Sequence, residues 1–197
     1  MQGDLWLNYK SYASINAMKY FAVQVKTRGE EKYIRLFQAL HPEITIKVYF
    51  PKREIDIRRR GVIVHTSLGI FPGYIFIELE GEEDLHDYQW AFRSTDGFYR
   101  FLKSNQNICA LQDKDLEMVL HFIKKVGPVA GKSKVYFDEN ARIVVSEGPL
   151  MGLEGKIIKV DKRKGRAKIK LDLYDDTFSI DLAFEVIGVL EGGHRGR

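Results

Sequence analysis

The spacing of apolar residues changes at Gly127-Pro128, and no other feature of the chain constrains its fold as strongly. Before this point, strand-like alternation and helix-like spacing follow one another. After it, only alternation remains, interrupted by turn residues about every ten positions. Mixed helices and strands favour an α+β domain, whereas short strands with regular turns favour a small barrel. We therefore predict an α+β N-terminal domain, an antiparallel sheet with helices on one face, followed by a small all-β barrel.

The predicted boundaries follow from this division. Residues 1–17 have no sustained period and are predicted to form a loose N-terminal extension, with Met18 a candidate for the original start. The stretch after Val126 is small, contains glycine and lacks periodicity, which is typical of a linker. The remaining parts are a first domain at 18–126, the linker at 127–134, the barrel at 135–190 and a tail at 191–197.

Two segments of the first domain carry the apolar stripe of an amphipathic helix. Tyr33, Leu36, Phe37 and Leu40 lie at i, i+3, i+4 and i+7. A second stripe follows the N-cap candidate Asp113 and ends before the linker. Strand-like segments are predicted at 20–25, 46–50, 74–79 and 98–102, with a basic hairpin at 54–64 and a short helix at 84–92.

The predicted strand at 74–79 follows a Phe-Pro-Gly turn and presents two different faces. Ile75, Ile77 and Leu79 point to one face, beneath the helices. Tyr74 and Phe76 point to the opposite face, which is bare if the helices lie on one side of the sheet. Apolar side chains on a bare face mark a docking surface, so we expect a partner there. The alternative is that another part of the chain folds over this face and buries it.

Positive charge gathers in one part of the predicted barrel. Between positions 156 and 170, Asp161 is the single acidic residue among eight basic ones. A hairpin arm and tip with one sign of charge are typical of a phosphate-binding surface, although a solvated basic turn is the alternative. Asp172, Asp175, Asp176 and Asp181 lie beyond this stretch, which predicts a polarised barrel. The predicted nucleic-acid-binding residues are Lys156, Lys159, Lys162, Arg163, Lys164, Arg166, Lys168 and Lys170.

Two smaller basic groups lie in the first domain. Lys26 and Arg28 end the first strand, within reach of a neighbouring phosphate, and are included among the predicted nucleic-acid-binding residues. Arg58-Arg59-Arg60 form the tip of the predicted hairpin, a position that equally suits a solvated turn. The net charge of +4 favours an acidic partner only weakly, because the charge of a whole chain does not locate a site.

Residues typical of catalysis or metal binding do not form a recognisable site. The five histidines are scattered without ligand spacing, and Cys109 lies in no motif of an activated thiol. We therefore expect no enzymatic activity, no metal and no cofactor. The single cysteine excludes an intrachain disulfide, and neither a bilayer-spanning apolar run nor a signal peptide is present. These observations favour a soluble cytoplasmic protein.

Several segments resemble the NusG family of transcription elongation factors. Tyr20-Phe21-Ala22-Val23-Gln24-Val25 followed by Gly29, the turn Phe71-Pro72-Gly73-Tyr74, and Ser94-Thr95-Asp96-Gly97-Phe98 are similar to the family's N-terminal domain. Glu147-Gly148-Pro149 through Gly152-Leu153-Glu154-Gly155 is similar to the KOW motif of its SH3-like C-terminal barrel. The resemblance extends from Met18 to Leu190 and keeps the order of the two domains.

This resemblance implies a monomeric factor that binds the clamp helices of RNA polymerase and suppresses pausing and termination. The hydrophobic pocket of the family falls on Phe71, Tyr74 and Phe76, and Phe101 is a fourth polymerase-binding candidate. Lys26 and Arg28 match positions that approach the non-template DNA strand in relatives. In general factors of the family, the barrel recruits the termination factor Rho or ribosomal protein S10.

One loop departs from the family pattern. General factors carry Phe-Gly-Arg at the partner-binding tip of the barrel, where this chain has Tyr174-Asp175-Asp176 and the opposite charge. This departure favours a specialised paralogue, similar to the LoaP and RfaH antiterminators, whose barrel contacts nascent RNA. The alternative is a general elongation adaptor whose barrel recruits a protein, Rho or ribosomal protein S10, in place of RNA.

Overall fold

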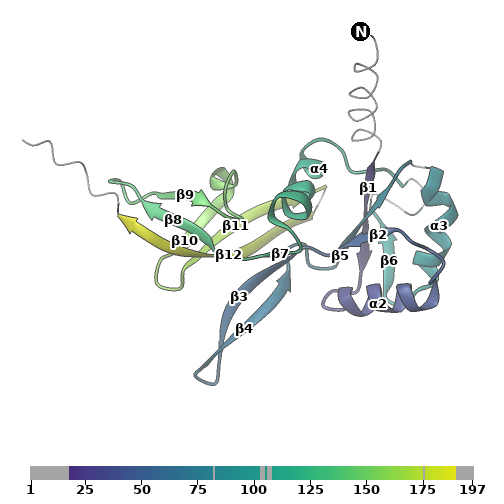
Figure 1. The fold of residues 1–197 in the computed structure, drawn as a ribbon, viewed down its shortest axis with the longest axis horizontal. Coiled ribbons are helices and arrows are strands. Elements are labelled where there is room, and N and C mark those ends of the chain that lie inside the picture. The colour runs from purple at the N-terminus through teal and green to yellow at the C-terminus, as the bar shows by residue number, and fades with distance from the viewer. Residues whose placement is uncertain (1–17, 82, 103–104, 106–107, 175, 190–197) are drawn as a thin grey trace, which may run out of the picture. The chain divides into compact units, whose positions relative to one another are not determined.

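The computed structural model describes residues 18–81, 83–102, 105, 108–174 and 176–189, and the chain divides into two compact units (Figure 1). The first unit comprises Met1–Phe50 and Phe71–Leu116, and the second comprises Pro51–Ile70 and Glu117–Arg197. The predicted extension at 1–17 and tail at 191–197 lie outside the described residues.

The first unit is built on an antiparallel sheet of four strands in the order β2-β5-β1-β6. The predicted strands are all present, with boundaries that differ by a residue or two. Gly29 precedes α2, and Glu30 and Glu31 occupy its first turn. Their negative charges interact favourably with the positive end of the helix dipole and stabilise the helix. The elements are β1 (Lys19–Val25), α2 (Glu30–Leu40), β2 (Lys47–Tyr49), β5 (Tyr74–Leu79), α3 (Glu83–Ser94) and β6 (Phe98–Phe101).

One face of this sheet holds the core of the first unit. Apolar residues of β1 and β5 pack there against Tyr33 and Phe37 from α2 and against Phe92 from α3. The rings of Phe37 and Phe92 stack with centroids 4.3 Å apart. The Tyr33 hydroxyl donates to the Phe92 carbonyl oxygen at 2.7 Å, and burial raises the pKa of Tyr33 well above its usual value. The predicted helical stripe is confirmed at Tyr33 and Phe37, whereas Leu40, at its end, is 54% exposed.

The second unit contains two sheets. A five-stranded sheet has the order β10-β11-β12-β8-β9, and a three-stranded sheet has the order β4-β3-β7. The helix α4 (Asp113–Leu120) begins in the first unit, and the π-helix η1 (His121–Val126) continues it to Gly127, as the stop signal predicts. The other elements are β3 (Lys52–Arg59), β4 (Val62–Gly69), β7 (Val129–Ala130), β8 (Ser133–Phe137), β9 (Ile143–Glu147), η2 (Glu154–Lys156), β10 (Ile157–Asp161), β11 (Arg166–Leu173) and β12 (Asp176–Val189).

The hairpin β3–β4 belongs to the second unit, although its position in the sequence predicts a place in the first domain. Lys52 and Arg53 of β3 pair in parallel with Val129 and Ala130 of β7, and the Lys52 amide donates to the Pro128 carbonyl at 3.0 Å. The expected linker at 127–134 is therefore not unstructured, because it supplies β7 and the first residues of β8. Alternation identifies a strand, but it does not tell which sheet the strand joins.

Gly148 is the position in the second unit where the backbone most clearly requires glycine. Its φ is +98°, and a Cβ there would lie 2.7 Å from the Cα of Ser133 in β8. Backbone atoms cannot move aside as a flexible side chain does. We therefore expect Gly148→Ala to lower the free energy of unfolding by about 2–4 kcal/mol, from left-handed strain and overpacking together. Urea denaturation of the full chain measures this.

Gly152 provides the control for this prediction. It also has a positive φ, +81°, but a Cβ added at this residue would meet no atom within 4 Å. Gly152→Ala therefore introduces the backbone strain without the collision, and we expect a loss of about 1–2 kcal/mol. Equal losses for the two variants would mean that the close approach to Ser133 contributes nothing.

Candidate nucleic-acid interface

Tyr74 and Phe76 lie on the sheet face opposite the core, as the alternation predicts, but both are buried. Their exposed fractions are 1% and 0%, and that of the neighbouring Phe71 is 1%. The rings of Phe71 and Phe76 meet edge to face with centroids 5.3 Å apart. The expectation of a bare docking face is wrong for this conformation. Phe71 packs against Phe76 on this face, and all residues of β5 are buried, so the face is covered and not bare.

Phe101 lies on the other face of the same sheet. It is the register partner of Val23 in β1 and packs within the core, where its ring centroid is 5.9 Å from that of Phe92 and 5.3 Å from that of Phe98. The structure therefore does not bring Phe101 together with Tyr74 and Phe76. The fourth polymerase-binding candidate therefore lies apart from the other three.

The face that carries Tyr74 also contains a buried carboxylate. Glu78 accepts hydrogen bonds from the hydroxyls of Tyr20 at 2.8 Å and Tyr49 at 2.6 Å, and from Lys47 Nζ at 3.0 Å. Glu78 is buried, whereas the Lys47 side chain is largely exposed. Neighbouring strands supply these donors, because Tyr20 and Lys47 are both register partners of Glu78. A charge can remain inside this sheet because hydrogen-bond donors surround it.

Most of the predicted basic residues of the barrel come together on the outer face of β10 and β11 and in the turn between these strands. Ala167, Ile169 and Leu171 point inward and are buried, so the residues between them in β11 point outward. Lys159 of β10 is the register partner of Lys168. The turn between β10 and β11 adds the exposed tip. We call this surface the basic face: Lys159, Lys162, Arg163, Lys164, Arg166, Lys168 and Lys170.

Aspartates interrupt the basic face more than the sequence indicates. Asp181 of β12 is the register partner of Lys168, and Asp172 Oδ1 lies 3.9 Å from Lys170 Nζ. Asp161 Oδ2 lies 3.9 Å from Lys164 Nζ. The prediction of a polarised barrel is therefore wrong at Asp172 and Asp181, because strand pairing returns β12 alongside the basic strand. The two ion pairs, Lys164–Asp161 and Lys170–Asp172, lie largely in solvent and are weak, so these lysines stay available to a stronger anion.

Two of the predicted basic residues occupy different surroundings. Lys162 Nζ lies 3.8 Å from the centroid of the Phe137 ring, a cation–π contact that holds the turn over β8. Lys156 lies in η2, before β10 begins, and is half-buried. In the first unit, Lys26 and Arg28 are exposed in the turn after β1. Lys26 and Arg28 therefore belong to the first unit, whereas the basic face belongs to the second.

The base of the hairpin is anchored by a buried arginine. Arg53 of β3 is 8% exposed and donates through Nη1 to the Gly69 carbonyl oxygen of β4. Burial lowers the pKa of Arg53 to about 10, and the negative charge of Asp181 on β12 opposes this shift. Arg53 therefore keeps its charge at neutral pH. Its electrostatic attraction to Asp181 links the hairpin to the barrel strand that borders the basic face.

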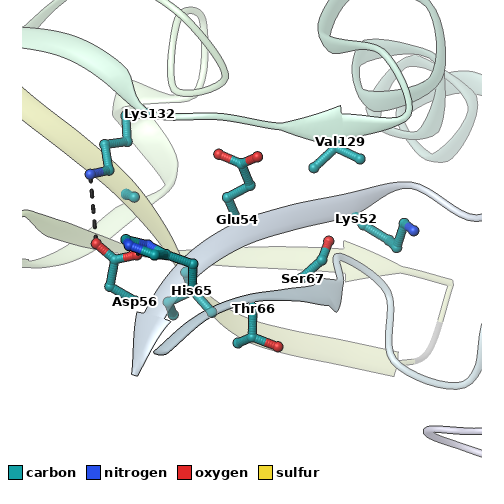
Figure 2. A pocket seen from close by; sticks show the side chains of 10 residues that line it. Lys52, Glu54, Asp56, His65, Thr66, Ser67, Val129 and Lys132 are labelled. Atoms are coloured by element: carbon teal, nitrogen blue, oxygen red, sulfur yellow. Dashed lines mark hydrogen bonds and ion pairs between the residues drawn. The ribbon is translucent and has the colours of Figure 1, made fainter. Parts of the chain in front are cut away.

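A hollow of about 480 Å³ lies within the second unit, between the hairpin, β7 and β12. Figure 2 shows Lys132 and Val129 on one side of it, facing the hairpin strand that carries Glu54. Asp56 Oδ1 forms a hydrogen bond with His65 Nδ1 at 2.5 Å, and Asp56 Oδ2 lies 3.6 Å from Lys132 Nζ. The hydrogen bond from His65 lowers the pKa of Asp56. We call this the hairpin hollow: Lys52, Glu54, Ile55, Asp56, His65, Thr66, Ser67, Val129, Lys132 and Ala183.

The hairpin hollow is absent from the sites that the sequence predicts. Its residues come from three segments that are far apart in the chain. The arginine tip of the hairpin, which the sequence analysis considers as a candidate for a duplex contact, does not line the hollow. Arg58 and Arg60 are exposed instead at the end of the hairpin. The available signal is the alternation of polar residues at Glu54 and Asp56 on one strand with His65 and Ser67 on the next, which places them on one face.

Comparison with known proteins now identifies the class of this molecule. Residues 18–120, slightly more than half of the chain, match the family described as "Transcription termination factor nusG". The chain belongs to the NusG family. It is 23% identical over 180 residues to the transcription termination/antitermination protein NusG of Escherichia coli O6:H1, covering 90% of this chain and 95% of that protein. The protein of the same name from Buchnera aphidicola is 23% identical over 143 residues, covering 72% of this chain and 76% of that protein.

A solved structure supports the fold. The NusG of Thermotoga maritima, described as "Domain interaction in Thermotoga maritima NusG", has a TM-score of 0.51 and 18% identity, covering 84% of this chain and 93% of that chain. The predicted family and the predicted fold class, α+β followed by a small barrel, are confirmed. The chain thus belongs to the class of transcription termination/antitermination factors. Among the helices that the structure describes, none has the length and apolar character to cross a bilayer.

Proposed function

We propose that this chain is a transcription elongation and antitermination factor that contacts RNA polymerase through its first unit and nascent RNA through its barrel. Membership of the NusG family supports the transcription role. The basic face carries the RNA part of the proposal, since its cations project from adjacent strands and from the turn that joins them. Among the described residues, Lys159, Arg163 and Arg166 have no carboxylate within ion-pair distance, so they are available to phosphates.

Salt dependence tests the RNA contact directly. Each phosphate contact on a single strand contributes about 0.7 to the slope of log affinity against log salt concentration. Replacing Lys164 and Arg166 by Ala should therefore flatten the slope by about 1.4. Fluorescence anisotropy with a labelled single-stranded RNA over a salt series measures the slope.

The pair Lys32→Ala and Arg35→Ala is the matched control, because it removes the same charge from exposed positions of α2 in the first unit. An unchanged slope for the Lys164/Arg166 variant, or equal flattening by the control, would remove the proposed RNA role of the basic face.

The polymerase contact carries a structural requirement. Phe71, Tyr74 and Phe76 remain our candidates, but side chains that are 0–1% exposed cannot touch a partner until whatever covers them moves. A partner that binds the uncovered form shifts the chain toward it, at the cost of exposing apolar surface. Hydrogen exchange in the presence of RNA polymerase should then change at residues 71–79. Protection that changes elsewhere in the first unit and not there would place the contact on another surface.

Transcription assays test the activity as a whole. In single-round transcription across a pause site and a terminator, we expect the chain to shorten the pause and increase readthrough. A specialised paralogue should do so only on particular leaders, whereas a general factor should act on all templates. Unchanged pausing on every template at saturating protein would contradict the antitermination role.

One observation favours a second candidate function, an adaptor whose barrel binds a protein such as Rho or ribosomal protein S10. Ile158, Val186 and Ile187 of the barrel strands are each at least half exposed, as expected of a protein-binding surface. Asp175 of the departing loop lies outside the described residues. Pull-down with the full chain, with and without ribonuclease, separates the two candidates, because capture of a protein after ribonuclease treatment supports the adaptor.

A further inference from the structure

The hairpin hollow adjoins the basic face along β12. Ala183, which lines the hollow, and Asp181, which borders the basic face, are two residues apart and therefore point to the same side of the strand. Arg166 of the basic face is the register partner of Ala183. The hollow and the basic face therefore meet along β12.

The hollow offers a carboxylate that is not engaged. Asp56 is bonded to His65 and lies near Lys132, whereas Glu54 is exposed and has no cation within ion-pair distance among the described residues. Figure 2 shows the Glu54 side chain directed from β3 toward the segment with Val129 and Lys132. Val129 supplies apolar surface on the side that Glu54 faces. Ile55 points to the opposite face of β3 and lines the hollow together with Ala183. The volume of about 480 Å³ falls in the range of about 300–1,000 Å³ that is usual for small-molecule sites.

We propose, resting on the RNA contact proposed above, that the hairpin hollow binds one unpaired guanine base of an RNA whose backbone lies on the basic face. A carboxylate only accepts hydrogen bonds, so it matches best a base edge with adjacent donors. The Watson–Crick edge of guanine presents such a pair in N1–H and the N2 amino group. This edge is free in single-stranded loops, where proteins read RNA sequence, and is hidden in a duplex.

The charges around Glu54 distinguish guanine from the other natural partner of a carboxylate, an arginine side chain. Lys52 and Lys132 line the same hollow, and the basic face adjoins it. A cationic partner would meet these charges unfavourably. A nucleotide instead brings a neutral donor edge to Glu54 and an anionic phosphate to the lysines. Ser67, the register partner of Glu54, supplies a hydroxyl on the same face of the hairpin for the remaining polar atoms of a base.

The test compares Glu54→Gln with Glu139→Gln, a control that removes the same charge from an exposed position in the same unit. The probes are stem-loop RNAs whose loops are uridine except for one guanosine, placed at each loop position in turn, together with the all-uridine loop. We expect the full wild-type chain to bind one guanosine loop about 10–100-fold more tightly than the uridine loop, as for a good bidentate contact. Glu54→Gln should abolish that preference, and Glu139→Gln should keep it.

The sign of the effect makes the outcome decisive. If Glu54 only repels RNA, Glu54→Gln removes a negative charge and should tighten binding to every loop equally, which would overturn the proposal. Equal wild-type affinity for guanosine and uridine loops would also overturn it, while leaving the RNA contact of the basic face intact. A wild-type chain that binds none of the RNAs at low salt would remove both proposals. Binding of an arginine-rich peptide that depends on Glu54 would assign the hollow to a protein partner and reject guanine.

Discussion

Replacing Tyr74 by Ala should lower the free energy of unfolding by about 3–5 kcal/mol, as is usual for a buried aromatic side chain. The side chain is 1% exposed in the central strand β5, and its neighbours on that face are also buried. Its removal leaves a cavity that the strands on either side, held in register, cannot close. Urea denaturation of the full chain, with a probe in the first unit, measures the loss.

Tyr99 provides the matched control. It lies on β6 in the same sheet but is 57% exposed, so Tyr99→Ala should change stability by less than about 0.5 kcal/mol. A Tyr74 variant that is as stable as the Tyr99 variant, and yet loses polymerase binding, would show that the face around Tyr74 is open in solution. A large loss of stability agrees with the structure and makes Tyr74→Ala unsuitable for mapping a polymerase contact.

The second large effect concerns Glu78. Glu78→Ala should cost about 2–4 kcal/mol, because hydrogen bonds to a charged group contribute about 1.5–3 kcal/mol each and do not add fully. The variant removes the acceptor from the Tyr20 and Tyr49 hydroxyls within the sheet. The Lys47 contribution is small, since that side chain is largely in solvent. The same denaturation experiment measures this change.

A double-mutant comparison isolates the hydrogen bond. In a chain that already carries Tyr20→Phe, Glu78→Ala should lower the free energy of unfolding by less than it does in the wild type. The reason is that no Tyr20 hydroxyl remains that would lose its hydrogen-bond acceptor. Glu78→Gln should cost less than Glu78→Ala, since an amide oxygen still accepts one hydrogen bond. Equal costs in the two backgrounds would mean that the Tyr20 hydroxyl takes no part in how Glu78 stabilises the sheet.

The elements of the first unit are accessible from the sequence because each carries its own local signal. The stripe through Tyr33 and Phe37 and the Pro-Gly turn before β5 are examples. The burial of both faces of β5 is harder to predict from the sequence. Its run Tyr-Ile-Phe-Ile-Glu-Leu is nearly all apolar, which is typical of a strand covered on both faces, but the same run also fits alternation with one bare side. The apolar stripe of α4 also has to be buried, and spacing alone does not say against which surface.

The candidate site is predictable only in part. The basic strand and turn at Lys162–Lys170 are continuous in sequence, so their charge is visible there. Asp181 is remote in sequence and reaches Lys168 only through strand pairing. The hairpin hollow depends on a parallel pairing between β3 and β7, which are separated in sequence by β4 and by the second segment of the first unit, Phe71–Leu116. Non-local pairing of this kind leaves no local pattern, so the surroundings of Glu54 become apparent only in three dimensions.

The path of the hairpin has a consequence for exchanging parts between members of the family. A chimeric protein joined within residues 127–134 would take its hairpin from one parent and the strand beside it from the other. Arg53 would then face a position 181 that was selected for a different neighbour. A swap meant to transfer transcript selectivity should therefore move residues 51–70 together with everything after Glu117 as one two-part cassette.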